Sequence, residues 1–154
     1  MIAGQEESDE RLANLLEQAR KIAVVGVKDE PNRDAYRIPL YLQRAGYRIL
    51  PVNPKLDRVL DEECHASLTD LSEAVDIVNL WRASEYVPAH VDEILALQQK
   101  PRAVWMQLGI HHGEAAQRLR EAGIEAIQDR CIMVEHRRLL STDPAGSSRA
   151  PQTP

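Results

Sequence analysis

The stretch Ile22-Ala23-Val24-Val25-Gly26-Val27 decides the class of fold, because a short apolar run that reaches a glycine is typical of a buried strand leading into a turn. Four further runs along the chain have the same character. They cover residues 48–52, 75–81, 103–106 and 124–127. Each is short, mostly β-branched or aliphatic, and bounded by polar residues or glycine. The pattern therefore predicts five buried strands.

Amphipathic stretches lie before and between these runs and predict helices. We expect a first helix after Ser8 as N-cap, a second over 35–45, a third after Ser84 as N-cap and a fourth over 113–122. Strands that alternate with helices predict a doubly wound α/β domain, in which a parallel sheet is covered by helices on both faces.

Length and charge exclude several classes of protein. The chain has 154 residues, with 19 Lys or Arg and 24 Asp or Glu, so its net charge is −5 with neutral His. This length favours one domain with one sizeable core. The acidic total does not indicate nucleic-acid binding. No apolar run approaches the roughly 20 residues of a membrane span, and the acidic start is unlike a signal peptide.

Cysteine usage points to a reducing compartment. Cys64 and Cys131 are too few for a disulfide framework and form no C-x-x-C motif for zinc. We therefore expect a cytoplasmic protein.

The two ends of the chain differ from its centre. Residues 1–8 are polar and acidic, and we expect a flexible arm there. Residues 141–154 are rich in Pro, Ser and Thr and carry no large apolar side chain, which predicts a disordered tail. The domain itself is expected to cover 9–140.

The residues that follow each strand are the candidate ligand-binding residues, because ligands of doubly wound folds bind at the carboxyl ends of the strands. The first strand is followed by Gly26, Lys28 and Arg33 but lacks the second and third glycines of a dinucleotide fingerprint. A glycine turn, a helix N-terminus and two cations suit a phosphate. The alternative is a solvated turn before a helix.

The second strand is followed by Asn53, Pro54 and Lys55, where an NAD-binding domain usually has a carboxylate. A cation at this place suits a ribose that carries a phosphate, as in coenzyme A (CoA) or NADP. The alternative is one more exposed lysine. The third strand ends at Trp81 and Arg82, and Trp81 can either stack on a ligand or pack in the core.

The fourth strand is followed by Gln107, Leu108 and Gly109, and the glycine allows close backbone approach. The fifth is followed by Arg130. Cations therefore follow four of the five strands, which predicts an anionic ligand with several phosphates. The alternative is chance, because loops are where lysine and arginine normally lie.

Catalytic and metal sites are not indicated. His111 and His112 have no further ligand at a suitable spacing. Cys131 and His136 are five residues apart, so on one helix they would not share a face. We predict no catalytic residue and no metal ligand.

Read in order, these segments resemble a known family. The motifs are Val24-Val25-Gly26-Val27, Pro31-x-Arg33, Gly46-Tyr47, Pro51-Val52-Asn53-Pro54, Ser67-Leu68, Arg82-x-x-Glu85-x-Val87-Pro88, Trp105-x-Gln107-Leu108-Gly109-Ile110, Asp129-Arg130-Cys131 and Glu135-His136-x-Arg138-Leu139. They resemble the stand-alone CoA-binding domain proteins, which are relatives of the N-terminal domain of the succinyl-CoA synthetase α subunit. The resemblance covers about residues 10–140.

The resemblance implies a Rossmann-like fold of five parallel strands with CoA or acyl-CoA held across the strand ends. The loop 26–33, which includes Val27, would meet the diphosphate, and 53–55 would lie by the phosphorylated adenosine. Residues 80–83 and 106–108 would line the rest. The chain departs from many relatives at Lys28, Asp61 and His65.

The related ligases work through a phosphorylated histidine on a second domain, which these 154 residues do not include. The expected function is therefore CoA binding without catalysis, as a carrier or a regulatory module, with a protein partner or self-association left open. One alternative is an NADP-dependent enzyme or redox sensor. Another is a protein-interaction module whose pocket is empty.

Overall fold

A computed structural model describes residues 8–141 and shows one parallel sheet of five strands. Its order is β2-β1-β5-β6-β7. The strands are β1 Lys21–Val25, β2 Arg48–Val52, β5 Ile77–Leu80, β6 Ala103–Met106 and β7 Glu125–Ile127. All five predicted strands are present, although most are shorter than the apolar runs. The prediction of a doubly wound α/β domain is confirmed.

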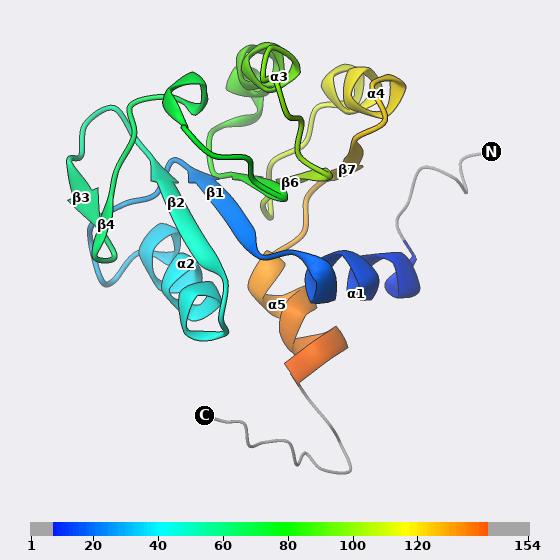
Figure 1. Ribbon diagram of the computed structural model, residues 1–154. Coiled ribbons are helices and arrows are strands. Elements are labelled where there is room, and N and C mark those ends of the chain that lie inside the picture. Colours follow the sequence, from blue (N-terminus) through cyan, green and yellow to red (C-terminus); the bar gives the residue numbers. More distant parts are fainter. Residues whose placement is uncertain (1–7, 142–154) are drawn as a thin grey trace.

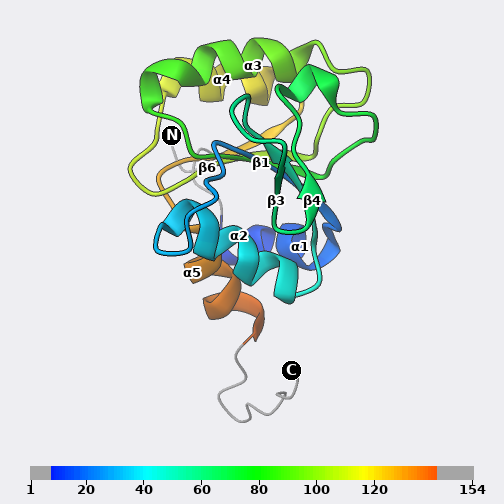
Figure 2. The ribbon, with the colours of Figure 1, turned by 90° about the vertical axis from the view of Figure 1, so that its left-hand side faces the viewer.

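Helices cover both faces of the sheet, as Figures 1 and 2 show. Helices α3 and α4 lie on one face, and α1, α2 and α5 lie on the other. Their bounds are α1 Asp9–Gln18, α2 Asp34–Arg44, α3 Val87–Leu95, α4 Gly113–Glu121 and α5 Ile132–His136. The parallel strands require such crossovers, because each chain segment must return to the same edge before the next strand begins.

The alternation of side chains along β1 explains why its sequence is apolar without a break. Ile22 and Val24 belong to the core under α1, α2 and α5. Ala23 and Val25 belong to the second core, under α3 and α4. A central parallel strand is buried on both faces, so every position along it favours an apolar residue.

Short elements between β2 and β5 were not predicted. A two-stranded antiparallel sheet joins β3 Arg58–Val59 to β4 Glu62–Glu63, and the 3₁₀ turn η2 covers Leu68–Asp70. The hairpin turns through Leu60 and Asp61, both with positive φ. Such a turn usually contains glycine or asparagine, and two-residue strands carry no periodicity, so no sequence pattern indicates this hairpin.

The start of α3 corrects one prediction. Ser84 does not cap this helix, because it begins a separate 3₁₀ turn, η3 Ser84–Tyr86, and α3 starts only at Val87. The Ser84 hydroxyl instead accepts a hydrogen bond from the backbone N–H of His111, 3.0 Å away. Ser8, by contrast, does cap α1 by accepting from the Arg11 N–H.

The end of the domain was also not predicted as a helix. After α5 the chain continues as a π-helical turn, η4 Arg137–Ser141. Ser141, the first residue of the predicted tail, belongs to this turn, and the rest of the predicted tail and most of the predicted N-terminal arm lie outside the described residues. Within residues 8–141 no helix is long and apolar enough to cross a membrane.

A buried histidine joins α5 to α2. His136 is 8% exposed, and its Nδ1 lies 2.7 Å from the hydroxyl of Tyr41. Burial lowers the pKa of His136 below its ordinary value. The unfolded chain therefore binds a proton more readily than the folded chain does, so acid favours unfolding.

We expect the free energy of unfolding to fall as the pH drops below the ordinary histidine pKa of about 6.5. One proton allows a slope of at most about 1.4 kcal/mol per pH unit. Urea unfolding between pH 7.5 and 5.5 measures it. His136→Gln should flatten the dependence, while His111→Gln, at an exposed position, should not. An unchanged slope in His136→Gln would contradict the assignment.

Candidate ligand-binding site

A cavity of about 480 Å³ lies at the carboxyl ends of β2, β1 and β5. The chain passes from β1 to β2 on one side and later returns to place β5 on the other side of β1. This reversal of strand order separates the loops on the two sides and leaves a crevice between them. The cavity therefore occupies the place where doubly wound folds bind their ligands.

Gly26 lets the loop after β1 turn directly beside β5. Its φ is +95°, and a Cβ built at this position would lie 3.1 Å from the Cβ of Trp81. Backbone hydrogen bonds join the strand ends at this point. The Gly26 N–H donates to the Val52 carbonyl, and the Trp81 N–H donates to the Val25 carbonyl. Both the backbone conformation and the available space require glycine here.

Lys28 is positioned by a proline in the following helix. Pro39 lies inside α2 and has no N–H to donate to the carbonyl of Ala35, four residues earlier. The backbone N–H of Lys28 donates to that carbonyl instead, at 3.2 Å. The loop after β1 is thereby tied to the first turn of α2.

Asn53 joins the first two loops. Its side-chain Nδ2 donates to the carbonyl of Val27 at 2.7 Å, and its Oδ1 accepts from the Lys55 N–H at 2.8 Å. The second contact closes an Asx turn and so sets the direction of the chain at Lys55. An apolar residue at 53 would provide neither bond.

Trp81 is held by a buried amide. Its indole N–H donates to Oδ1 of Asn79 at 2.8 Å, and Nδ2 of Asn79 donates to the carbonyl of Trp105 and to Oε1 of Gln107. Asn79 is fully buried, so these bonds satisfy groups that water cannot reach. The network fixes the indole at the wall of the cavity.

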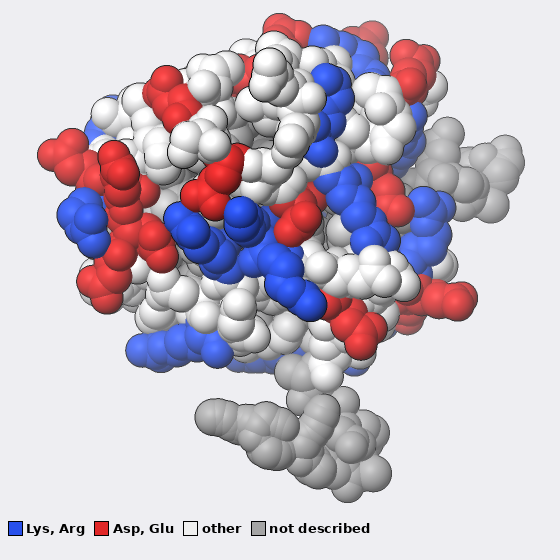
Figure 3. All heavy atoms as spheres, in the orientation of Figure 1, with Lys and Arg blue, Asp and Glu red and all other residues white. Residues whose placement is uncertain are grey.

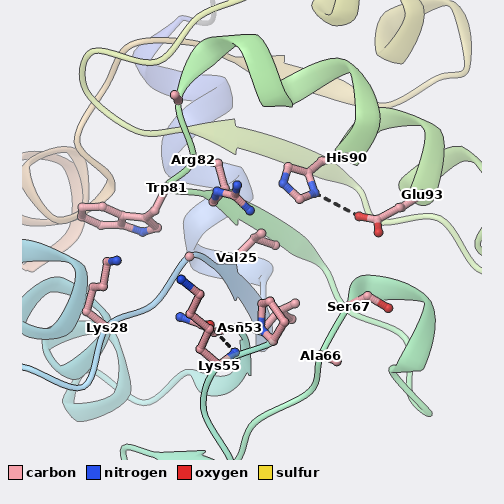
Figure 4. Close-up of a pocket in the computed structure, with 14 residues that line it drawn as sticks. Val25, Lys28, Asn53, Lys55, Ala66, Ser67, Trp81, Arg82, His90 and Glu93 are labelled. Carbon is pink, nitrogen blue, oxygen red and sulfur yellow. Dashed lines mark hydrogen bonds and ion pairs between the residues drawn. The ribbon is translucent and has the colours of Figure 1, made fainter.

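Three cations line the cavity, and each comes from a different strand end. Lys28 and Lys55 reach toward it from the loops after β1 and β2, and Arg82 lies across from them with its guanidinium 4.6 Å from the centre of the Tyr86 ring (Figure 4). Within residues 8–141, none of the three forms an ion pair with a carboxylate. Their positive charge is therefore available to an anion.

The opposite edge of the sheet is arranged differently. There Lys21 and Arg48 both form ion pairs with Glu73, at 2.9 Å each. The hydrogen bond and ion pair with Lys21 hold the pKa of Glu73 below its ordinary value. Figure 3 shows Lys and Arg interspersed with Asp and Glu over the face that it draws. Lys21 and Arg48 therefore have a carboxylate partner, whereas the three cations of the cavity have none among the described residues.

One wall of the cavity was not predicted from the sequence. Ser67 follows the hairpin, and His90 and Glu93 lie one turn apart on α3. Nδ1 of His90 is 2.9 Å from Oε1 of Glu93. Their spacing of three residues places them on one helix face, but only the packing of α3 over the strand ends turns that face toward the cavity.

The structure brings together seven of the predicted residues, namely Gly26, Lys28, Asn53, Pro54, Lys55, Trp81 and Arg82. The other six do not line this cavity. Val27 and Gln107 are buried, Leu108 and Gly109 are exposed beyond β6, Arg33 pairs with Glu30, and Arg130 pairs with Glu135.

Two further groups near the site have structural contacts. Burial raises the pKa of the Cys64 thiol, which donates to the carbonyl of Asn53 at 3.6 Å. His112 accepts at Nδ1 from the Ala115 N–H and so caps α4. In the part of the chain that the structure describes, no group of three or more His, Cys, Asp or Glu could hold a metal ion.

Fold and site together define a doubly wound α/β protein with a cavity lined by three cations at the switch point of its sheet. Residues 20–137 match the family described as CoA binding domain. The chain therefore belongs to the CoA-binding domain family, and the resemblance seen in its sequence motifs is confirmed.

Similar proteins include stand-alone chains of about the same length. The uncharacterized protein YneT of Bacillus subtilis is 37% identical over 132 residues, which is 86% of this chain and 96% of YneT. The solved structure of the cell-free protein ID.343 from Thermus thermophilus is 46% identical, with a TM-score of 0.82, and the alignment covers 87% of this chain and all of that one.

The chain is also distantly related to a CoA ligase. An ADP-forming acetate–CoA ligase of Archaeoglobus fulgidus is 28% identical over 71 residues, which is 45% of this chain and 10% of the ligase. The related region is the CoA-binding region of these succinyl-CoA synthetase-like enzymes.

We expect Gly26→Ala to destabilise the fold more than Gly123→Ala does. Both glycines have positive φ, but an added Cβ meets Trp81 at position 26 and nothing within 4 Å at position 123. Backbone strain alone costs about 1–2 kcal/mol, and the steric contact adds about 1 kcal/mol or more. Urea unfolding measures both variants. Equal losses would show that the close approach to Trp81 is not a constraint.

Proposed function

We propose that this protein binds CoA or acyl-CoA in the cavity at the switch point, as a non-catalytic carrier or regulatory module. The observation that carries the proposal is the set of unpaired cations, Lys28, Lys55 and Arg82, gathered around one cavity in a chain of net charge −5. CoA carries a diphosphate and a 3′-phosphate. The membership of this chain in the CoA-binding domain family supports CoA over other polyanions as the ligand.

The two loops after β1 and β2 suggest where the diphosphate and the 3′-phosphate of CoA bind. We assign the diphosphate to the loop after β1, where Gly26 permits close backbone approach and Lys28 supplies charge. We assign the phosphorylated adenosine to the Asn53 turn, which directs Lys55 toward the cavity. Charge-assisted hydrogen bonds of this kind are the strong ones in phosphate recognition.

In this proposal the pantetheine arm runs along the sheet edge. Strand β6 lies next to β5, and Leu108 and Gly109 follow β6. Leu108 is 68% exposed, which leaves an apolar side chain free to contact an extended ligand. In this proposal the two residues contact the arm after it leaves the cavity, while Arg33 and Arg130 keep their carboxylate partners.

The contacts of the wall residues support binding without chemistry. The hydroxyl of Ser67 bonds to Thr69 and Asp70 and not to His90. The raised pKa of Cys64 favours a protonated thiol, which is a poor nucleophile. We also propose a cytoplasmic location, which suits two free cysteines.

Calorimetric titration with CoA and with dephospho-CoA tests the proposal. We expect CoA to bind about tenfold more tightly than dephospho-CoA, because the 3′-phosphate is held by a charge-assisted contact to Lys55. Lys55→Ala should weaken CoA binding by a similar factor and leave dephospho-CoA unchanged. The difference should shrink at high salt, since the contact is partly exposed.

Lys100→Ala is the matched control. Lys100 is exposed and its ammonium bonds to the Leu97 carbonyl at the end of α3, outside the cavity lining. This variant should bind both ligands as the parent chain does. If neither CoA nor acyl-CoA binds detectably at millimolar concentration, the proposal is wrong. Tight binding of NADPH that CoA does not displace would favour the NADP-dependent alternative instead.

A further inference from the structure

Hydrogen-bond acceptors line the cavity from α3, across from Lys28 and Lys55. Lys28, Lys55 and Arg82 face the space from the strand ends, while His90 and Glu93 line it from α3 (Figure 4). The Glu93 side chain is 30% exposed and that of His90 is 15% exposed. Both side chains are therefore accessible to a ligand in the cavity.

Hydrogen-bond chemistry determines which donors and acceptors the wall formed by His90 and Glu93 presents to the cavity. An ionised carboxylate only accepts hydrogen bonds, so in the contact of 2.9 Å the proton lies on Nδ1 of His90. In the neutral ring Nε2 is then an acceptor. Glu93 keeps its second carboxylate oxygen, and no hydrogen bond to it is found within residues 8–141. The wall thus presents acceptors and a negative charge.

A phosphate is repelled by such a wall. The part of the ligand that lies against it must carry no negative charge and must donate hydrogen bonds. A group with two hydrogens on one nitrogen suits two neighbouring acceptors. In a molecule built from a phosphorylated adenosine and a pantetheine arm, the exocyclic amino group of adenine is the group of this kind.

We propose that Glu93 and His90 recognise the exocyclic amino group of adenine and so determine the base specificity of the site. This inference rests on the proposed function, since it takes CoA as the ligand. Glu93 accepts one amino hydrogen, and Nε2 of His90 accepts the other. The Nδ1 contact holds the carboxylate in place for this purpose.

The size of the cavity favours the base over the arm. The cations and the acceptor pair line one space of about 480 Å³. A nucleoside is compact and keeps its base close to the ribose phosphate, whereas the pantetheine arm is joined beyond the diphosphate and leaves along the sheet edge. The group held near both Lys55 and Glu93 is therefore the base.

The test compares CoA with its hypoxanthine analogue, in which a carbonyl oxygen replaces the amino group. A carbonyl oxygen cannot donate a hydrogen bond, so the acceptors of Glu93 and His90 are left without a partner. We expect the parent chain to prefer CoA by about tenfold in calorimetric titrations. Glu93→Gln supplies an amide that can donate to the carbonyl, so the preference should fall close to one.

Asp92→Asn is the matched control. Asp92 is the neighbour of Glu93 on α3, but it is exposed and pairs with Arg118 at 2.6 Å. The variant removes the same charge from the same helix outside the cavity lining and should keep the tenfold preference. Its behaviour separates base recognition from a change in overall charge.

Three results would overturn the inference. One is equal binding of the two ligands by the parent chain, and another is an unchanged preference in Glu93→Gln. The third is an equal increase in the affinity of Glu93→Gln for both ligands with the preference for CoA unchanged, because Glu93 would then act only by repelling the phosphates. Absence of CoA binding to the parent chain is a separate result and would overturn the proposed function itself.

Discussion

The close approach of Gly26 to Trp81 is the constraint on which the site depends. The ends of β2, β1 and β5 stay in hydrogen-bonded register up to this point, through the Gly26 N–H to Val52 and the Trp81 N–H to Val25. A side chain at position 26 would press against Trp81. Because glycine fits, the loop after β1 turns away within one residue, and the cavity opens where the strand order reverses.

Around this point the fold uses backbone and side-chain amides to hold its loops. The carbonyl of Ala35, left without an intrahelical donor by Pro39, receives the N–H of Lys28. The amide of Asn53 ties the loop after β2 to that after β1. A third amide, that of Asn79, orients the indole of Trp81. Each bond satisfies a polar group that burial would otherwise penalise, and each also fixes one wall of the cavity.

The cations of the cavity differ in their partners from other cations near the strand ends. Lys21, Arg33, Arg48 and Arg130 all have carboxylate partners. The cations of the cavity have none among the described residues, although the chain carries more acidic than basic groups. Keeping like charges close to one another costs stability. Such an arrangement is typical of a site where an anionic ligand supplies the missing charge.

The sequence by itself determined the order of strands and helices along the chain, the class of fold and the presence of cations after four of the five strands. Continuous apolar runs and helical periodicity are local properties, and parallel strands bring their carboxyl ends to one edge whatever the details of packing. The sequence also determined that Gly26 and Asn53 would occupy turns. Short features escaped it, because the β3–β4 hairpin turns through Leu60 and Asp61 without a glycine.

Only the tertiary structure decided which of these residues share a cavity. Arg33 and Arg130 follow strands as Lys55 does, but Glu30 and Glu135 neutralise them. His90 and Glu93 lie far along the chain from the loops they face, and the packing of α3 over the sheet edge brings them there. Position along a strand is a local property that sequence patterns record, whereas the partner of a charge depends on contacts between distant segments.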